Sequence, residues 1–322
     1  MTKASLNWAR RTLAYHQLGT YGILVALAIW FTLFSPQFLT VNNLLTLALQ
    51  TSLIALVAIG MTFTIITGGI DLSVGSTAAL AGVIAAGIAV QFGTYPGLLA
   101  GMMTGIGIGF INGALIVWGR LPPFVATLAS MAAARGLTLV YTQGRPIAGL
   151  DRTFTFWGSD SLFGVPIPVW VLLCTALIAH LVLRQTRLGL HLYAVGGNEE
   201  TARLAGVNVP QVTFSAYLIS GWFAALSGII LTARLWSAQP NTGIGLELDA
   251  IAAAVLGGSS LAGGSGGIVG TIAGSFIIGM LANGLNLLGV PSYNQQVIKG
   301  LIFIAAVMMT GGIGRPNRRR GA

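Results

Sequence analysis

The segment MTFTIITGGIDLSVGSTAALAGVIAAGIAV (61–90) consists of two apolar runs separated by a short break that contains the acidic residue Asp71. Gly68 and Gly69 are expected to end the first helix, and a second helix is predicted to begin near Leu72. An ionised side chain at the centre of a membrane span costs at least about 2.5 kcal/mol, so such a residue is a functional candidate. The segment therefore predicts two membrane helices with a carboxylate held at the turn between them.

The composition of the whole chain supports a membrane location. Of its 322 residues, 55% are hydrophobic and 7% are charged, whereas a soluble domain is about 25% charged. Seven acidic and sixteen basic residues cannot cover a water-facing surface of this size, so most of the exterior must face lipid. The net charge of +9 does not indicate nucleic acid, because the basic residues lie at the chain ends and in a few loops.

Apolar windows of about 20 residues, the length that crosses a bilayer as a helix, divide the chain into about ten candidate spans. The expected spans are 20–34, 44–66, 72–91, 97–118, 122–141, 167–183, 212–233, 249–262, 267–288 and 296–311. The first, eighth and tenth are short. The sequence thus predicts an all-α, polytopic membrane helix bundle of about ten transmembrane helices, in a single domain over residues 1–322.

The distribution of Lys and Arg predicts the orientation, because cytoplasmic loops collect these residues. The basic residues of the N-terminus (Lys3, Arg10, Arg11), of the loop 184–211 and of the C-terminal tail all fall on one side of a ten-span bundle, which places both termini in the cytoplasm. The external loop 142–166 is an exception, since it contains Arg145 and Arg152.

Glycines inside the spans predict close helix packing. Gly101, Gly105, Gly109 and Gly113 repeat every four residues and share one helix face, and so do Gly266, Gly270 and Gly274. The strings GGIDLSVGS (68–76) and GGSSLAGGSGG (257–267) also form a faint internal echo, of the kind found in transporters with repeats.

The acidic residues within or beside spans have structural interpretations as well as functional ones. Asp71 can cap the helix that follows it and hold a re-entrant turn, or it can act as a polar gate or substrate contact. A proton-relay role is a third option, although no second acid or His lies nearby in sequence. Glu247 and Asp249 open the eighth span, where the helix dipole favours acidic residues.

The loop 184–211 contains NEETARLAGVNV, which predicts a short cytoplasmic helix. Asn198 is the expected N-cap, Glu199 and Glu200 fall in the first turn, and Gly206 is the expected stop. Such a helix suits either a cap on the bundle or docking into a groove on a partner. The sequence has no Walker loop, no metal-ligand spacing and no catalytic constellation, so any ATP must be bound by another chain and no metal site or enzyme activity is expected.

Five strings resemble the ribose-type, monosaccharide branch of ABC importer permeases. They are MTFTIITGGIDLSVGS, PPFVATLASMAAARG, YAVGGNEETARLAGVNV, SAQPNTGIGLELDAIAAAVLGGSSLAGGSGGIVGT and NGLNLLGVPSYNQQVIKG. The resemblance implies a bacterial inner-membrane subunit that translocates a monosaccharide as a homodimer. It also implies a cytoplasmic ATPase that binds ATP and Mg, and a periplasmic sugar-binding protein.

The short helix also resembles the coupling loop of ABC permeases, whose pattern is EAA, three residues, then Gly. Glu200, Thr201, Ala202 and Gly206 match it, with Thr for the first Ala, whereas the downstream Leu-Pro of the wider pattern is absent. Asn198, Glu199, Glu200, Thr201, Ala202 and Gly206 are therefore the expected contacts with the ATPase.

Candidates for the sugar pathway or its gate are Asp71, Asn112, Glu247, Asp249, Asn283 and Asn286. The three Asn amides can hydrogen-bond a sugar or, equally, join helices to each other. Arg145 and Arg152 are either ordinary loop residues or, together with Arg234 at the outer end of the seventh span, docking residues for the binding protein, because complementary charge steers encounter. The alternative function is an ion-coupled secondary transporter of a small polar solute, for which Asp71 is the sole candidate acid well separated from a long loop.

Overall fold

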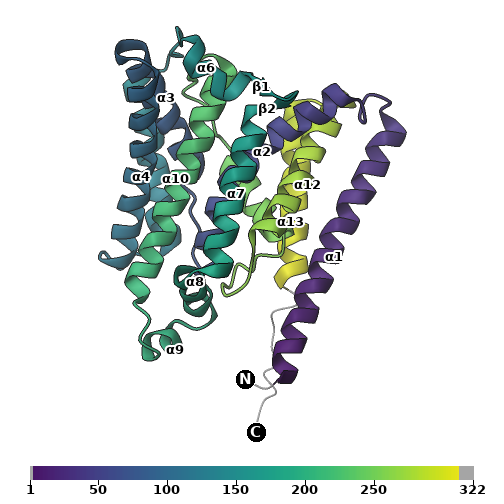
Figure 1. Cartoon of the computed structure of the whole chain (residues 1–322), viewed down its shortest axis with the longest axis vertical. Helices are drawn as coiled ribbons and strands as arrows, with labels where there is room; N and C mark the ends of the chain where they lie inside the picture. The colour runs from purple at the N-terminus through teal and green to yellow at the C-terminus, as the bar shows by residue number, and fades with distance from the viewer. Residues whose placement is uncertain (1–2, 312–322) are drawn as a thin grey trace.

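The structure is a computed structural model that describes residues 3–311. Within this range the chain forms α1 (Lys3–Phe34), α2 (Val41–Ile66), α3 (Val74–Phe92), α4 (Thr94–Val117), α5 (Pro123–Thr142), α6 (Arg152–Ser159), β1 (Ser161–Leu162), β2 (Val165–Pro166), α7 (Ile167–Gln185), α8 (Arg187–Gly197), α9 (Glu199–Leu204), α10 (Val209–Leu235), α11 (Leu246–Leu256), α12 (Ile268–Leu287) and α13 (Ser292–Gly311). The helical bundle predicted from the sequence is confirmed (Figure 1). β1 and β2 form a small antiparallel hairpin in which Ser161 pairs with Pro166.

Seven of the described helices are long and apolar enough to cross a membrane, namely α2, α3, α4, α5, α7, α10 and α12. Their bounds follow the predicted spans closely, as in α10, which covers 209–235 where 212–233 was expected. α3 begins at Val74, two residues after the predicted start, because Asp71 and its neighbours remain in the turn.

The three spans that are short in the sequence differ from the other seven. Gly19–Phe34 is the apolar part of α1, and it is shorter than a full span. The predicted span 249–262 is wrong, because α11 has only 11 residues and therefore rises about 16 Å in a bilayer core of about 30 Å. α11 ends where Gly258 adopts a positive φ of 92°, and the chain continues without a helix until Ile268. α13 corresponds to the tenth predicted span.

The first glycine stripe packs α4 tightly against two neighbours, as predicted. A Cβ atom added to Gly101 would lie 2.8 Å from the carbonyl oxygen of Ala81 on α3. Added to Gly105, it would lie 2.4 Å from the carbonyl oxygen of Gly221 on α10. These helices approach backbone to backbone, which only small residues allow.

The second glycine stripe is shorter than expected. Gly270 and Gly274 lie on α12 and contact the backbone of Gly257, which follows α11, and of Ala253 within it. Gly266 precedes α12 and belongs to the break between α11 and α12.

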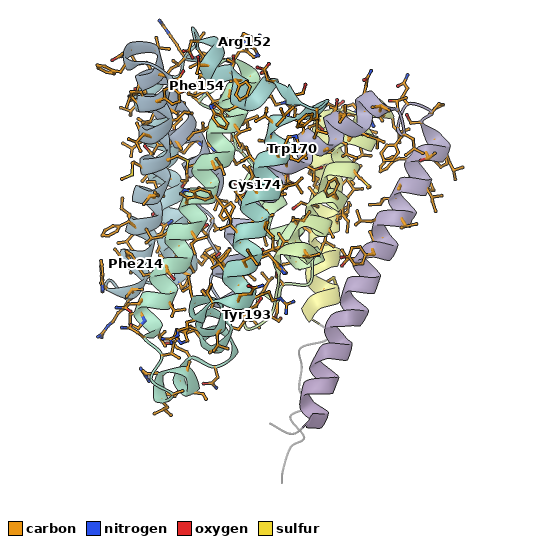
Figure 2. The ribbon with its side chains drawn as sticks, in the orientation of Figure 1. Arg152, Phe154, Trp170, Cys174, Tyr193 and Phe214 are labelled. Atoms are coloured by element: carbon orange, nitrogen blue, oxygen red, sulfur yellow. The ribbon has the colours of Figure 1, made fainter. Side chains whose placement is uncertain are left out.

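The two ends of the bundle carry different elements. α6 and the β1–β2 hairpin lie at one end, and α8 and α9 lie at the other, where α1 also begins (Figure 1). Figure 2 shows Arg152 at the first end and Tyr193 near the second. This arrangement places the segments 142–166 and 184–211 at opposite ends, as the charge distribution predicts. The Arg residues of the C-terminal tail lie outside the described residues.

The segment 236–245, which joins α10 to α11, enters the bundle. It begins beside the α6 end, where Ile147 and Ala238 form a β-bridge. It then reaches the first turn of α3, where a Cβ atom added to Gly75 would lie 2.3 Å from the carbonyl oxygen of Gly243. Because α3 ends at Phe92, a rise of 1.5 Å per residue puts this contact about 25 Å below that end.

Candidate functional site

The break between α2 and α3 holds Asp71 in a buried position. α2 ends in a Schellman motif, in which the Gly68 amide donates to Ile65 and the Gly69 amide to Thr64. Asp71 follows with 1% exposure. Its Oδ1 accepts from the Ser73 amide at 3.0 Å and from the Ser73 hydroxyl at 2.6 Å. The carboxylate thus fixes the turn that starts α3, although the N-cap residue of α3 is Ser73.

Two other helices complete the Asp71 cluster. Ser220 of α10 donates from its hydroxyl to Asp71 Oδ2 at 2.8 Å. Asn112 of α4 donates from Nδ2 to the Ser73 hydroxyl at 2.8 Å and lies 3.4 Å from Asp71 Oδ1. Among the described residues no Lys or Arg forms an ion pair with Asp71. Hydroxyl and amide groups therefore solvate this buried carboxylate in place of water.

Two buried polar atoms at the cluster have no hydrogen-bond partner in the described chain, namely Asn112 Oδ1 and Tyr217 Oη. Tyr217 lies one turn before Ser220 on α10, and its hydroxyl lies close to Gly69, where an added Cβ atom would be 2.3 Å away. Asn112 Oδ1 can accept a hydrogen bond from a bound polar molecule or water, and the Tyr217 hydroxyl can donate or accept one. Sequence analysis missed Ser220 and Tyr217, because a single hydroxyl in an apolar span carries no local signal.

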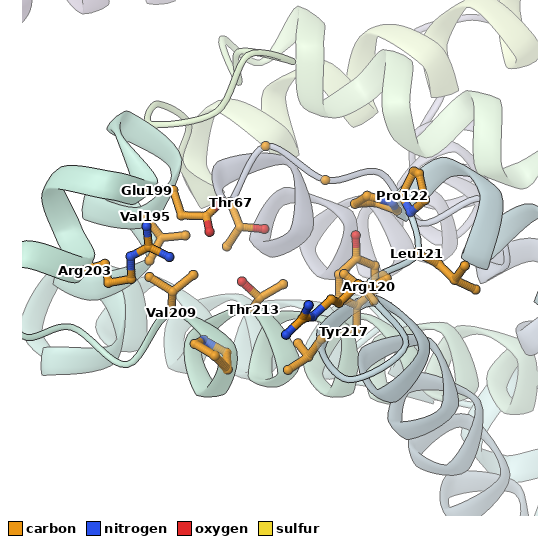
Figure 3. Close-up of a pocket in the computed structure, with 16 residues that line it drawn as sticks. Thr67, Arg120, Leu121, Pro122, Val195, Glu199, Arg203, Val209, Thr213 and Tyr217 are labelled. Atoms are coloured by element: carbon orange, nitrogen blue, oxygen red, sulfur yellow. The ribbon is translucent and has the colours of Figure 1, made fainter.

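A pocket of about 590 Å³ lies beside this cluster, between the α2–α3 break, the α4–α5 connection and α9. Tyr217 and Gly69 belong to its wall, and so do Thr67, Arg120 and Arg203. Figure 3 shows Arg203 and Glu199 at one side of the pocket, and Arg120 and Leu121 at the other. The pocket therefore connects the surroundings of Asp71 with the end of the molecule that carries α9.

Of the remaining pathway candidates, Asp249, Asn283 and Asn286 tie helices together, whereas the Glu247 carboxylate lies beside Gly75 in the first turn of α3. Glu247 and Asp249 lie in the first turn of α11, as predicted. The Glu247 carboxylate accepts from the Gly245 amide at 3.3 Å. Asp249 forms an ion pair with Lys299 of α13 at 2.7 Å.

The two amides on α12 are likewise engaged. Asn283 exchanges two hydrogen bonds with Asn43 of α2, at 2.9 and 3.0 Å. The Asn286 side-chain oxygen accepts from Gln295 Nε2 at 2.7 Å. Of the three Asn candidates, the structure brings only Asn112 into the Asp71 cluster.

The predicted short helix is α9, and its local geometry follows the sequence pattern. The Asn198 side chain accepts from the Thr201 amide at 2.8 Å and so caps the start. Gly206 has a φ of 84°, and a Schellman motif closes the end through the Gly206 and Val207 amides. Ala202 is buried, whereas Leu204 is 80% exposed and presents an apolar side chain outward.

α8 leads into α9. Its backbone packs against the break between α2 and α3 and against the break between α11 and α12. The Gly264 amide donates to the Ile66 carbonyl at 2.9 Å. Gly196 lies against both groups, because an added Cβ atom would be 1.7 Å from the Ile66 oxygen and 2.6 Å from the Gly264 nitrogen. The Tyr193 hydroxyl of α8 donates to the Gly266 carbonyl at 2.8 Å. We refer to Ile66, Gly196, Gly264 and Gly266 as the glycine junction.

The three predicted docking arginines lie at the end with α6. Arg145 is exposed in the loop after α5, and Arg234 is half-buried in the last turn of α10. Arg152 forms an ion pair with Asp160 at 2.9 Å. Its charge is thus partly neutralised within the chain.

These observations define a multi-pass helical membrane protein with a buried polar cluster and a short projecting helix. Among the described residues, no group of three His, Cys, Asp or Glu side chains is placed to hold a metal ion. The family model described as the permease component of the branched-chain amino acid transport system matches residues 43–307.

Relatives match nearly the whole chain. The ribose import permease of Escherichia coli K12 is 47% identical over 91% of this chain and 92% of its own length. The ribose import permease of Bacillus subtilis 168 is 46% identical over the same shares. The D-allose transport system permease of Escherichia coli K12 is 40% identical over 95% of this chain and 94% of its own length. The chain belongs to this permease family, and it is the transport subunit of an ABC importer rather than an enzyme.

Proposed function

We propose that this chain is the membrane-spanning subunit of an ATP-driven monosaccharide importer, and that the sugar is ribose. The observation that carries the proposal is the identity of 47% and 46% with the ribose import permeases of Escherichia coli and Bacillus subtilis, each over 91% of the chain. The allose and arabinose permeases match at 40%. The family also favours ATP as the energy source over the ion-coupled alternative.

The Asp71 cluster is the best-supported part of the sugar pathway. Sugars expose hydroxyl groups that donate to carboxylates and accept from amides. Asp71 and Asn112 supply both kinds of group, and the unpartnered Tyr217 hydroxyl can do either. In this proposal Glu247, Asp249, Asn283 and Asn286 act as structural ties.

A separate cytoplasmic ATPase, which binds ATP and Mg²⁺, would dock on α9. The exposed Leu204 offers an apolar contact, and the two caps hold the helix in one conformation. The glycine junction supports this role, because a force on α9 would reach Ile66 and the adjoining Asp71 turn through packed backbone.

The orientation of the molecule follows from these partners. The end with α9 would face the cytoplasm of a bacterium, and the chain would lie in its inner membrane as a homodimer. The end with α6 would face the periplasm and receive a sugar-binding protein at Arg145, Arg152 and Arg234. Because Arg152 already pairs with Asp160, Arg145 and Arg234 would contribute most of the free charge.

Uptake by intact cells tests the substrate and the energy source together. A bacterium whose chromosomal copy is deleted would carry this chain on a plasmid, and entry of radiolabelled ribose would be measured with unlabelled allose or arabinose as competitors. We expect uptake to require the chain, to survive a protonophore while ATP is maintained, and to be displaced best by ribose. Abolition by the protonophore at normal ATP levels would support the ion-coupled class instead.

Thiol labelling tests the orientation. Single cysteines would replace Glu200 on α9 and Phe163, which is 89% exposed in the β1–β2 turn, on a Cys174→Ala background. An impermeant thiol reagent should label intact cells at position 163, and position 200 only after the membrane is opened. The reverse pattern would invert the proposed topology.

A further inference from the structure

An apolar groove lies between α4 and α7, where α10 passes between them (Figure 1). Its volume is about 430 Å³, within the range of about 300–1,000 Å³ that small-molecule sites occupy. α7 contributes Thr175, Ile178 and Val182 to the wall, and α10 contributes Trp222 and Phe223. We refer to this feature as the α7 groove.

The α7 groove lies at membrane depth. The 19 residues of α7 rise about 28 Å, close to the thickness of a bilayer core of about 30 Å. The groove residues of α7 extend from Thr175, near its midpoint, to Val182, near the end that leads into α8. Ile178 is 61% exposed, so the groove opens to the outside of the bundle. In the proposed orientation this half of α7 lies in the cytoplasmic leaflet.

The wall of the groove offers hydrocarbon contacts rather than hydrogen bonds. Apart from Thr175, its side chains are aliphatic or aromatic. The Thr175 hydroxyl is already engaged, because it donates to the Val171 carbonyl at 2.7 Å. A hydrocarbon chain in such a groove gains dispersion contacts on several sides, whereas on a flat helix surface it gains them on one. The groove therefore fits an acyl chain.

Positive charge lies at the α8 end of the groove. Ile178 and Val182 share a helix face that continues four residues later at Thr186. Arg184 and Arg187 flank Thr186, and both are exposed. Residues 161–198 contain no Asp or Glu, and neither arginine forms an ion pair within the described part of the chain. An anionic group at this end would meet charge that the chain leaves unneutralised.

We propose that the α7 groove binds one anionic phospholipid, with an acyl chain against Val182 and Trp222 and the phosphate at Arg184 and Arg187. Basic residues at the cytoplasmic side of membrane helices attract anionic headgroups. Val182 and Arg187 are five residues apart, so a single lipid can reach both the groove and the arginines. Only the choice of leaflet rests on the proposed function.

The bound acyl chain would contact a helix that holds the Asp71 cluster. Phe223 lies one turn after Ser220, which donates to Asp71. α2 approaches α10 closely here, because a Cβ atom added to Gly60 would lie 2.9 Å from the Phe223 Cβ atom. The lipid would therefore support the packing of α10 on α2. Because it binds the folded chain, it should raise the thermal stability by mass action.

Native mass spectrometry of the full chain in a mild detergent tests the site without measuring transport. Phosphatidylglycerol and phosphatidylcholine with the same acyl chains would be titrated, and bound lipid and melting temperature recorded. We expect one retained lipid per chain, with phosphatidylglycerol bound roughly 10- to 30-fold more tightly, given the contribution of each basic residue at a membrane surface. Glycerol phosphate, which has the charged group without the acyl chains, should not stabilise the chain.

Two variants of α7 form a matched pair. Val182→Trp fills the groove and should lose the retained lipid. Leu177→Trp places the same side chain at a position that is 59% exposed and outside the groove wall, and it should keep the lipid. If Val182→Trp fails to fold, Ile178→Trp takes its place. Replacing Arg184 and Arg187 together by Gln should abolish the preference for phosphatidylglycerol while one lipid stays bound.

Equal lipid retention in Val182→Trp and Leu177→Trp would overturn the proposal, and so would equal affinity of the unaltered chain for the two lipids. A single-helix protein that copurifies and is displaced by Val182→Trp would assign the groove to a protein partner instead. Stabilisation by glycerol phosphate alone would assign the arginines to a soluble anion. Failure of ribose uptake with normal lipid retention would count against the proposed substrate and not against this site.

Discussion

Replacing Gly196 with Ala should uncouple the permease from its ATPase. The new methyl group would push α8 away from Ile66 and Gly264 in the glycine junction. The added Cβ atom would lie 1.7 Å from the Ile66 oxygen and 2.6 Å from the Gly264 nitrogen. Both contacts are backbone, so neither can rotate away. The methyl group would also strain the hydrogen bond of 2.9 Å between these two residues.

The magnitude follows from three terms. Overpacking costs about 1–3 kcal/mol, and a weakened hydrogen bond costs about 0.5–1.5 kcal/mol. The better helix propensity of Ala returns about 0.5–1 kcal/mol. The net cost of about 0.5–4 kcal/mol is centred near about 2 kcal/mol, which corresponds to a loss of the correctly joined conformation of more than tenfold, since 1.4 kcal/mol is a factor of ten.

Gly197→Ala is the matched control, because an added Cβ atom there meets nothing within 4 Å. Transport-stimulated ATP hydrolysis and sugar uptake would be measured for both variants in the assembled complex, together with membrane levels and thermal stability. We expect Gly196→Ala to insert normally and lose coupling by tenfold or more, and Gly197→Ala to behave as wild type. Equal coupling in both variants would refute the reasoning, and so would an equal loss in both.

Three further changes test the other parts of the proposal. Gly206→Val should cost about 1–2 kcal/mol, because a β-branched residue resists the left-handed conformation; coupling should fall with insertion intact, and normal coupling would argue against docking on α9. Asp71→Asn should lower the initial uptake rate about tenfold, given about 1–3 kcal/mol for the unmatched buried partners, whereas unchanged uptake would exclude it from the pathway. Replacing Arg145 and Arg152 together by Ala should slow docking of the loaded binding protein, mainly at low ionic strength, without changing basal ATP hydrolysis. Docking kinetics that keep the wild-type salt dependence would place the docking surface elsewhere.

The short helix α9 could be predicted residue by residue because its determinants are local. Asn198 caps an amide three residues away, and Gly206 closes the end with bonds that reach back three and five residues. Which side chains of α9 are buried could not be predicted from these local determinants. The structure buries Ala202 and exposes Leu204, since the face that packs depends on where α8 directs the helix.

The predicted span 249–262 shows where hydropathy fails. Its composition is as apolar as that of a full span, but α11 stops at Leu256. Glycine is common in membrane helices and does not by itself mark an end. Here the end depends on contacts of the break with Ile66 and α8, which lie far away in the chain.

The sequence by itself determined the membrane location, the seven long spans and the caps of α9, because these depend on composition and on neighbours within a few residues. The tertiary structure decided what surrounds Asp71. Ser220 is 149 residues away and Asn112 is 41 residues away, so their convergence depends on how α4 and α10 pack against the α2–α3 break. It also decided that 236–245 enters the bundle, because the two Arg135 hydrogen bonds that hold this segment join residues 105 and 107 positions apart.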